Sequence, residues 1–139
     1  MRFMILVKAN EASEAGVLPD ERDLARMGRF NQELSDAGVL LAGEGLHPSS
    51  RGARVKFAGG TSTMARGPFP RSTDLIAGFW LWRVRSMAEA IQWVERAPFD
   101  DGAEIEIRPV LEAEDFGEAY TPELREQEER LRVQAALPK

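Results

Sequence analysis

Apolar positions follow two periods along the chain, and these periods predict the elements of the fold. Residues 2–8 are apolar at both alternating sets of positions, which predicts a strand covered on both faces. Residues 76–85 repeat this pattern with larger side chains, and residues 104–110 alternate strictly between apolar and charged positions. We therefore predict three strands in these segments.

Apolar spacings of three and four predict helices between the strands. The first helix begins near Pro19-Asp20 and ends at Gly38, and its apolar stripe is Leu24, Met27, Phe30, Leu34 and Ala37. A capping box at Ser86-Met87-Ala88-Glu89 opens the second helix before Pro98, and we expect its inward side chains to be Met87, Ala90, Ile91 and Val94. A last helix with a thin apolar stripe starts at Thr121-Pro122-Glu123.

The middle of the chain predicts shorter elements. Residues 10–18 are expected to be a loop, and residues 39–42 a second strand. Residues 53–57 and 61–65 predict a hairpin that turns at Gly59-Gly60. The resulting order predicts a ferredoxin-like βαββαβ fold of the α+β class, with an inserted hairpin in a domain at 1–116 and an acidic helical extension at 117–139.

The predicted topology leaves one face of the sheet without helices. Crossover connections are almost always right-handed, so both main helices fall on the same face. The strands predicted at residues 2–8 and 76–85 nevertheless carry large apolar side chains on both faces. A bare apolar face usually meets a partner, and we expect a second copy of the chain packed sheet against sheet, forming a homodimer.

Composition narrows the classes of function. The 139 residues suit one domain, and 43% hydrophobic with 29% charged residues is ordinary for a globular protein. Cysteine is absent and histidine occurs once, which excludes disulfides, a cysteine nucleophile and histidine-rich metal sites. The opening apolar run stops at Lys8, too early for a membrane span or signal segment. We expect a cytoplasmic protein with no membrane partner, no metal and no cofactor.

Charge is unevenly distributed along the chain. Residues 111–139 carry 4 Lys+Arg against 8 Asp+Glu, whereas residues 47–73 carry five basic side chains and no acid: Arg51, Arg54, Lys56, Arg66 and Arg71. The overall net charge of −5 argues against a nucleic-acid partner. The basic segment is open to three interpretations: an anion site, a solvated hairpin face, or a surface for the acidic tail of the same or the other subunit.

Five segments, in order, carry a family resemblance. They are Gly38-Val39-Leu40 with Gly45-Leu46-His47-Pro48, Gly67-Pro68-Phe69, Leu75-Ile76-Ala77-Gly78-Phe79-Trp80, residues 86–93, and residues 104–109. From Met4 to about Phe116 the chain resembles the YciI-like (YCII-related) family, in its subgroup with an Asp-Gly-Pro-Phe-Ala-Glu-Thr-Lys-Glu signature. The resemblance implies a dimeric α+β barrel, and it implies no settled activity.

The signature is degenerate in this chain. Arg66 stands where it opens with aspartate, Arg71 replaces its first glutamate, and Thr73 replaces its lysine. Asp74 keeps the final acid. We place Asp74 and Arg66 among the candidate substrate-binding residues.

Two acid–base candidates stand out among the titratable residues. Histidine is the residue type whose unperturbed pKa lies near neutrality, and His47 follows a glycine-rich strand end, with Glu44 three residues before it. Its alternative role is a loop histidine bonded to backbone. Glu106 and Arg108 share one face of the last strand, where the arginine can hold a substrate carboxylate and the glutamate can take a proton. The alternative for this pair is an ion pair that sets the register.

Trp80 and Trp82 lie on one face of the strand predicted at residues 76–85. They form either a wall of an aromatic-substrate pocket or the buried core of the dimer. From these residues we predict a cofactor-independent enzyme that acts on a small anionic or aromatic metabolite, with His47 and Glu106 as catalytic residues. Arg108, Glu44, Trp80 and Trp82 would bind the substrate. The alternative is a noncatalytic ligand-binding or regulatory dimer that contacts a protein partner.

Overall fold

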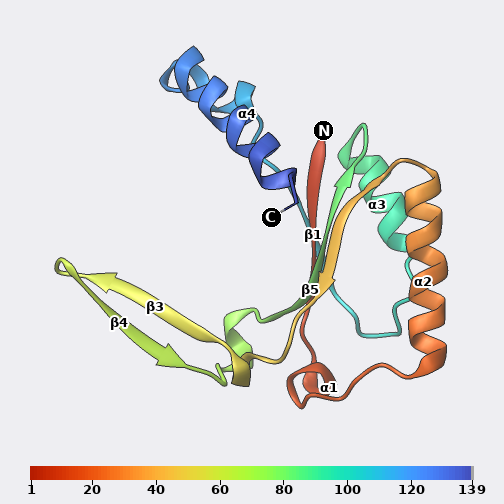
Figure 1. Cartoon of the computed structure of the whole chain (residues 1–139). Helices are drawn as coiled ribbons and strands as arrows, with labels where there is room; N and C mark the ends of the chain where they lie inside the picture. The colour runs from red at the N-terminus through yellow and green to blue at the C-terminus, as the bar shows by residue number, and fades with distance from the viewer. Residues whose placement is uncertain (139) are drawn as a thin grey trace. The chain divides into compact units, whose positions relative to one another are not determined.

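The computed structural model describes residues 1–138 and shows a mixed α+β fold (Figure 1). Its main sheet has the strand order β2-β5-β1-β6, and every neighbouring pair is antiparallel. The strands are β1 (Arg2–Lys8), β2 (Leu40–Gly45), β5 (Ile76–Arg83) and β6 (Ile105–Pro109). Helices α2 (Glu21–Asp36) and α3 (Met87–Glu95) cover one face of this sheet (Figure 1).

A separate hairpin interrupts the chain between β2 and β5. Strands β3 (Ala53–Ala58) and β4 (Thr61–Arg66) form their own two-stranded sheet, as predicted. They turn at Gly59 and Gly60, whose φ angles of 59° and 78° lie in the left-handed region that glycine adopts without strain. Short 3₁₀ helices, η1 (Ser49–Arg51) and η2 (Arg71–Thr73), flank the hairpin.

Local capping explains why the helix boundaries were predictable. The Asp20 carboxylate accepts a hydrogen bond from the Asp23 amide at the start of α2, and the Ser86 hydroxyl does the same for Glu89 in α3. The structure adds a short helix, α1 (Glu11–Glu14), within residues 10–18, where the sequence predicts a loop. The Asn10 side chain and Ser13 cap each other there, and such a box can hold a single turn.

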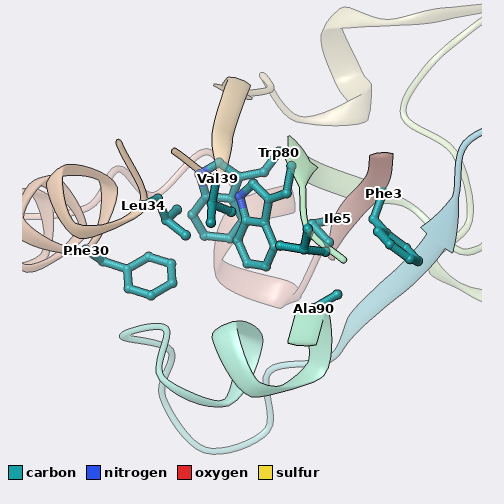
Figure 2. Packing of buried hydrophobic residues seen from close by; sticks show 9 residues of the cluster. Phe3, Ile5, Phe30, Leu34, Val39, Trp80 and Ala90 are labelled. Atoms are coloured by element: carbon teal, nitrogen blue, oxygen red, sulfur yellow. The ribbon is translucent and has the colours of Figure 1, made fainter. Parts of the chain in front are cut away.

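The core lies between the sheet and the two helices. Figure 2 shows Phe30 and Leu34 of α2 packed with Ile5 and Trp80 of the sheet and with Ala90 of α3. Isoleucines 105 and 107 pack against this core, as the alternation in β6 predicted. The inward stripe of α3 was half wrong: Ala90 and Val94 face the core, but Met87 and Ile91 are exposed.

The buried side of α3 differs from the predicted one for a geometric reason. Trp93 and Ala97 also pack against the core, so the buried stripe is rotated about the helix axis relative to the predicted one. Apolar residues lie on both sides of this short helix, and a period of 3.6 does not choose between them. Strand β2 also runs three residues beyond its predicted end at 42, to Gly45.

By its internal contacts, the chain divides into two compact units, Met1–Pro109 and the residues from Val110 onward. The second unit contains η3 (Ala113–Ala119) and helix α4 (Pro122–Ala136), which is capped by Thr121 as predicted and buries no side chain. The domain boundary at 116/117 stays a prediction, and Lys139, the last residue of the predicted extension, lies outside the described residues. Among the helices of residues 1–138, none combines the length and the apolar character that crossing a membrane requires.

Candidate functional site

A pocket of about 300 Å³ opens at one end of the main sheet, beneath the middle of α2. Its apolar walls come from β1, β2, β5, α2 and the loop after α3: Val7, Leu40, Trp80, Met27 and Phe99. Asn31 of α2 supplies a side-chain amide to the same space. Small-molecule sites are typically such concave, largely apolar spaces with a few polar groups.

Glycines make the floor of this pocket. Gly43 and Gly45 of β2 and Gly78 of β5 line it, and the register pairs Gly43 with Trp80 and Gly45 with Gly78. All four residues therefore belong to the helix-covered face of the sheet. A Cβ on Gly45 would meet no atom within 4 Å, so the space above this strand is open because a side chain is missing.

A second glycine in the floor is required by close packing. A Cβ on Gly43 would lie 2.5 Å from Cδ1 of Trp80. A side chain at this position would overlap the ring, so Gly43 lets the indole of Trp80 approach β2 closely and form a wall of the pocket. This arrangement ties the aromatic wall to the glycine floor.

The Trp80 indole is held by hydrogen bonding as well as by packing. Its Nε1–H donates to Oδ1 of Asn31 at 3.0 Å. The carboxamide nitrogen of Asn31, with two N–H donors, makes no hydrogen bond within residues 1–138. Asn31 therefore offers donors to a bound molecule, and an amide that is already oriented loses little freedom on binding.

The two tryptophans have different roles, which corrects the joint roles expected for them. Trp82 is 0% exposed within a single protomer and lies under the helices, so it is neither a pocket wall nor a core between two subunits. Trp80 lines the pocket while its ring packs against Phe30, Trp82 and Phe99. Both faces of β5 are apolar, and the sequence did not show which one the helices cover.

Glu44 and His47 do not meet in the structure. Glu44 pairs with Phe79, so its side chain belongs to the sheet face opposite Gly43 and the pocket, although the residue forms part of the rim. The exposed His47 ring lies 3.1 Å from Nη1 of Arg51, and no hydrogen bond joins it to Glu44 among the described residues. The predicted substrate contact of Glu44 therefore has no support inside the pocket.

The predicted pair of Glu106 and Arg108 lies on the uncovered face of the sheet. Arg108 Nη1 is 3.2 Å from Glu106 Oε2, and Lys8 Nζ is 3.3 Å from Oε1 of the same carboxylate. Lys8 Nζ also lies 3.5 Å from Asp74 Oδ1. The alternative role of the pair, an ion pair, is thus what the geometry contains, and the network joins β1 and β6 to Asp74 in the segment before β5.

This ion-pair network shifts the pKa values of its members. Hydrogen bonds from Arg108 and Lys8 hold the pKa of Glu106 below its usual range. Burial, the largest single effect on Lys8, lowers its pKa, but the hydrogen bonds and attraction from Glu106 and Asp74 together outweigh burial and raise it. A carboxylate with a lowered pKa is a weak base, so Glu106 is poorly suited to take a proton.

The Gly-Pro-Phe segment is anchored to distant parts of the chain. The Ser49 hydroxyl donates to Glu14 Oε2 at 2.6 Å, and the Ser49 amide donates to Oε1 at 3.0 Å. The Phe69 amide in turn donates to the Ser49 hydroxyl at 3.0 Å. These bonds lower the pKa of Glu14, because they favour its ionised form.

Gly67 is essential to this anchor for a steric reason. A Cβ at this position would lie 1.7 Å from the carbonyl oxygen of Ser49. The Arg54 guanidinium stacks 4.0 Å from the centre of the Phe69 ring and donates to Thr73 Oγ1 at 3.2 Å. The segment therefore joins the hairpin to η1 and, through Ser49, to α1. Arg66, the last residue of β4, is exposed and pairs with Ala53 in the hairpin.

Reasoning from the sequence missed most of the pocket. Asn31, Phe99 and the glycine floor were not predicted, whereas Trp80 and Glu44 were, although the side chain of Glu44 belongs to the opposite sheet face. The Gly43-Glu44-Gly45 pattern carried a usable signal, because two glycines two residues apart remove both side chains from one strand face. Within residues 1–138, no three Asp, Glu or His side chains gather in the manner of metal ligands.

Comparison with models of known protein families identifies the family of this chain. The family model described as the YCII-related domain matches residues 1–114. The structure of 5-chloro-2-hydroxyhydroquinone dehydrochlorinase from Burkholderia phenoliruptrix AC1100, in complex with 2,5-dihydroxybenzoquinone, is similar to this chain at 17% identity, with a TM-score of 0.44. The similarity covers 83% of this chain and 99% of that chain. No curated protein matched significantly.

Proposed function

Since the chain belongs to the YCII-related domain family, we propose that it is a small-molecule enzyme that works in the pocket beneath α2. The observation that carries this proposal is the pocket itself, with aromatic walls, a glycine floor and one amide. Its volume of about 300 Å³ lies at the small end of ligand sites, which favours a ligand of one ring.

The lining favours an uncharged aromatic substrate over an anionic one. No cationic side chain lines the pocket, whose lining residues are Val7, Met27, Asn31, Leu40, Gly43, Glu44, Gly45, Ala77, Gly78, Phe79, Trp80 and Phe99. A carboxylate or phosphate would therefore lose its hydration without gaining a counter-charge. An aromatic ring can pack on the wall that Trp80 and Phe99 form together, with an oxygen acceptor directed at Asn31.

The amide of Asn31 suggests the kind of chemistry. A preoriented N–H donor stabilises an oxygen on which negative charge develops, as in enolisation of a ketone or ionisation of a phenol. Trp80 holds the Oδ1 atom of Asn31, which leaves the nitrogen for this task. The proposal does not use His47 or Glu106 as catalytic groups: one is exposed beside Arg51, and the other is held by cations on the opposite sheet face.

We also propose a ferredoxin-like dimer, with the two uncovered sheet faces packed together. The strand order β2-β5-β1-β6 supports the ferredoxin-like description. Met4 and Leu6 of β1 and Phe79 and Leu81 of β5 point away from the helices, because their neighbours Ile5 and Trp80 are in the core. A second copy would cover this apolar surface.

One observation favours a noncatalytic alternative. Glu44 is the only titratable residue that lines the pocket, and the register places its side chain on the other face. A regulatory or ligand-sensing protein needs a pocket but no proton-transfer group inside it. The two proposals share the ligand site and differ in turnover.

A thermal-shift screen with matched ligands tests the site. Neutral phenols and aromatic ketones should raise the melting temperature more than benzoates or phosphates of the same size. A ligand at 100 times its dissociation constant adds about 2.7 kcal/mol to stability, so weak binding is detectable. Hits are then incubated with the protein in D₂O and followed by NMR, where deuterium uptake or a new product indicates catalysis.

Two glycine variants locate the binding site. Gly45→Val should abolish the shift: its Cβ meets no protein atom within 4 Å, so the new side chain occupies the space that the ligand would fill. Gly28→Ala, at an exposed position of α2 outside the pocket, is the matched control and should keep the shift. If the best hits were carboxylates whose shift survives Gly45→Val and is lost in Arg108→Ala, the ligand site would lie on the uncovered sheet face and the proposal would be wrong.

A further inference from the structure

The hairpin formed by residues 53–66, hereafter the hairpin arm, is exposed along its whole length. Its two strands pair only with each other. A lone two-stranded hairpin is marginally stable in water, and it usually needs a further surface to pack against. We therefore expect the hairpin arm to pack against a further surface.

The register shows that the hairpin arm is amphipathic. Val55 pairs with Met64 and Phe57 with Ser62, so these residues share one face. Val55, Met64 and Phe57 are 56%, 54% and 81% exposed. The opposite face carries Arg54 and Lys56 across from Ala65 and Thr63. Three large apolar side chains exposed on one face are typical of a surface that packs against a partner and not of an arm that contacts only water.

The basic face of the hairpin arm is turned toward its own chain at the root. The Arg54 guanidinium stacks on Phe69 and donates to Thr73, both in the segment that follows β4. Val55 is the next residue and points the other way. The apolar face is thus directed away from the segment that anchors the hairpin arm.

Two observations identify the occupant as a second copy of this chain. In Figure 1 the hairpin arm extends from the sheet on the side opposite α2 and α3, which is where a copy docked on the uncovered face would lie. The distribution of charge along the chain also supports a second copy as the occupant. Residues 47–73 hold five basic and no acidic side chains, whereas the rest of the chain holds 13 basic and 23 acidic ones (18 − 5 and 23 − 0). The remainder of a second copy is therefore acidic and attracts the hairpin arm.

We propose that each protomer's hairpin arm lies against the second copy, with Val55, Phe57 and Met64 packed on it and the basic side chains at the rim. This inference rests on the sheet-to-sheet dimer proposed above and extends it. The arms are exchanged symmetrically, so each subunit supplies one arm and receives one. Phe57, near the tip, is the anchor because it is the largest and most exposed of the three apolar side chains.

Site-specific cross-linking tests the contact directly. The chain has no cysteine, so Phe57→Cys introduces a single attachment point for a photoactivated benzophenone. On irradiation of the full-length protein, a covalent dimer should form, with the partner peptide in residues outside 47–73. The control is Arg29→Cys, at an exposed position on α2, which should give no covalent dimer. The absence of a covalent dimer from position 57, with the protein dimeric in solution, would overturn the proposal.

The dimer dissociation constant provides an independent measurement. Phe57→Thr keeps a residue suited to a strand but removes the apolar ring, and it should weaken the dimer at least tenfold. Ala58→Thr introduces the same residue one position along, on the basic face, and should change the constant less than threefold. Equal effects of the two variants in sedimentation equilibrium would contradict the packing assigned to Phe57.

These measurements distinguish failure of the arm contact from failure of the sheet-to-sheet dimer and of the ligand pocket. If the wild-type protein is monomeric at micromolar concentration, the dimer and the arm contact both fail, while ligand binding in the pocket is still judged by Gly45→Val. If Leu81→Glu dissociates the dimer but Phe57→Thr does not, the sheet-to-sheet contact holds and the arm contact fails. Loss of affinity in both variants, with the cross-link present, supports both contacts.

Discussion

Replacing Gly67 by alanine should destabilise the fold much more than a loop substitution usually does. The added Cβ would lie 1.7 Å from the carbonyl oxygen and 2.6 Å from the carbonyl carbon of Ser49. Both are backbone atoms, so no side-chain rotation relieves the overlap. The φ angle of Gly67 is not positive, and the cost therefore comes from space and not from backbone conformation.

The size of the effect follows from the hydrogen bonds that must break. Moving the two backbones apart disrupts the bonds from Gly52 N to Ser49 O (2.9 Å), from Gly67 N to Gly52 O (3.0 Å), and from Phe69 N to the Ser49 hydroxyl (3.0 Å). Each neutral hydrogen bond contributes roughly 1 kcal/mol net. Gly67→Ala should therefore lower the free energy of unfolding by about 3 kcal/mol.

Urea unfolding followed by far-UV circular dichroism measures this loss. Gly45→Ala is the control, because its Cβ meets nothing within 4 Å, and it should leave the free energy of unfolding unchanged or slightly raised. Amide exchange adds a local measurement: the Phe69 amide should lose protection in Gly67→Ala. A loss below about 0.5 kcal/mol, with Phe69 still protected, would refute the steric reasoning.

Three further predictions concern pH and the core. The pKa of Glu14 is lowered from 4.5 mainly by the hydrogen bond from the Ser49 hydroxyl. The ionised Glu14 carboxylate therefore contributes its full stabilisation above pH 4.5, and this contribution is lost as the pH falls through the pKa of Glu14 in the folded protein. Glu14→Gln should flatten the acid limb of a curve of unfolding free energy against pH. The pKa of Lys8 is raised from 10.5, so the charged Lys8 side chain contributes its full stabilisation below pH 10.5 and loses it as the pH rises further. Lys8→Met should flatten the alkaline limb of the same curve. An unchanged limb would mean that Lys8 does not form its ion pairs with Glu106 and Asp74. Leu34→Ala, at a fully buried position, should cost about 2–5 kcal/mol in urea unfolding, and a cost below 1 kcal/mol would show that the core is not packed as described.

Most elements were predictable because their signals are local. An N-cap serine or aspartate bonds an amide three residues away, and a glycine with positive φ ends a helix whatever lies around it. Strand β1 therefore matched its predicted bounds at residues 2–8, and the hairpin turned at Gly59 and Gly60 as expected. The exception was α1, a single turn held by one capping box.

The candidate site was less predictable, because it depends on contacts between residues far apart in the chain. Trp80 and Asn31 are joined by a hydrogen bond across 49 positions. The pocket exists because Gly45 and Gly78 lack side chains where α2 crosses the sheet, and empty space produces no hydrophobic period. The predicted pairing of Glu106 with Arg108 was local, two residues apart on one strand, and their predicted ion pair is present.

By itself, the sequence determined where most strands and helices lie, since periodicity, caps and turn glycines act over a few residues, but it missed α1 and ended β2 three residues early. It left undetermined which face of β5 the helices cover, because both faces are apolar. Tertiary structure decided that Trp82 is enclosed in the core, that Trp80 borders a pocket, and that Glu106 faces away from it. Those outcomes depend on how α2 packs across the sheet, and side-chain burial against a distant helix is a property of the whole fold.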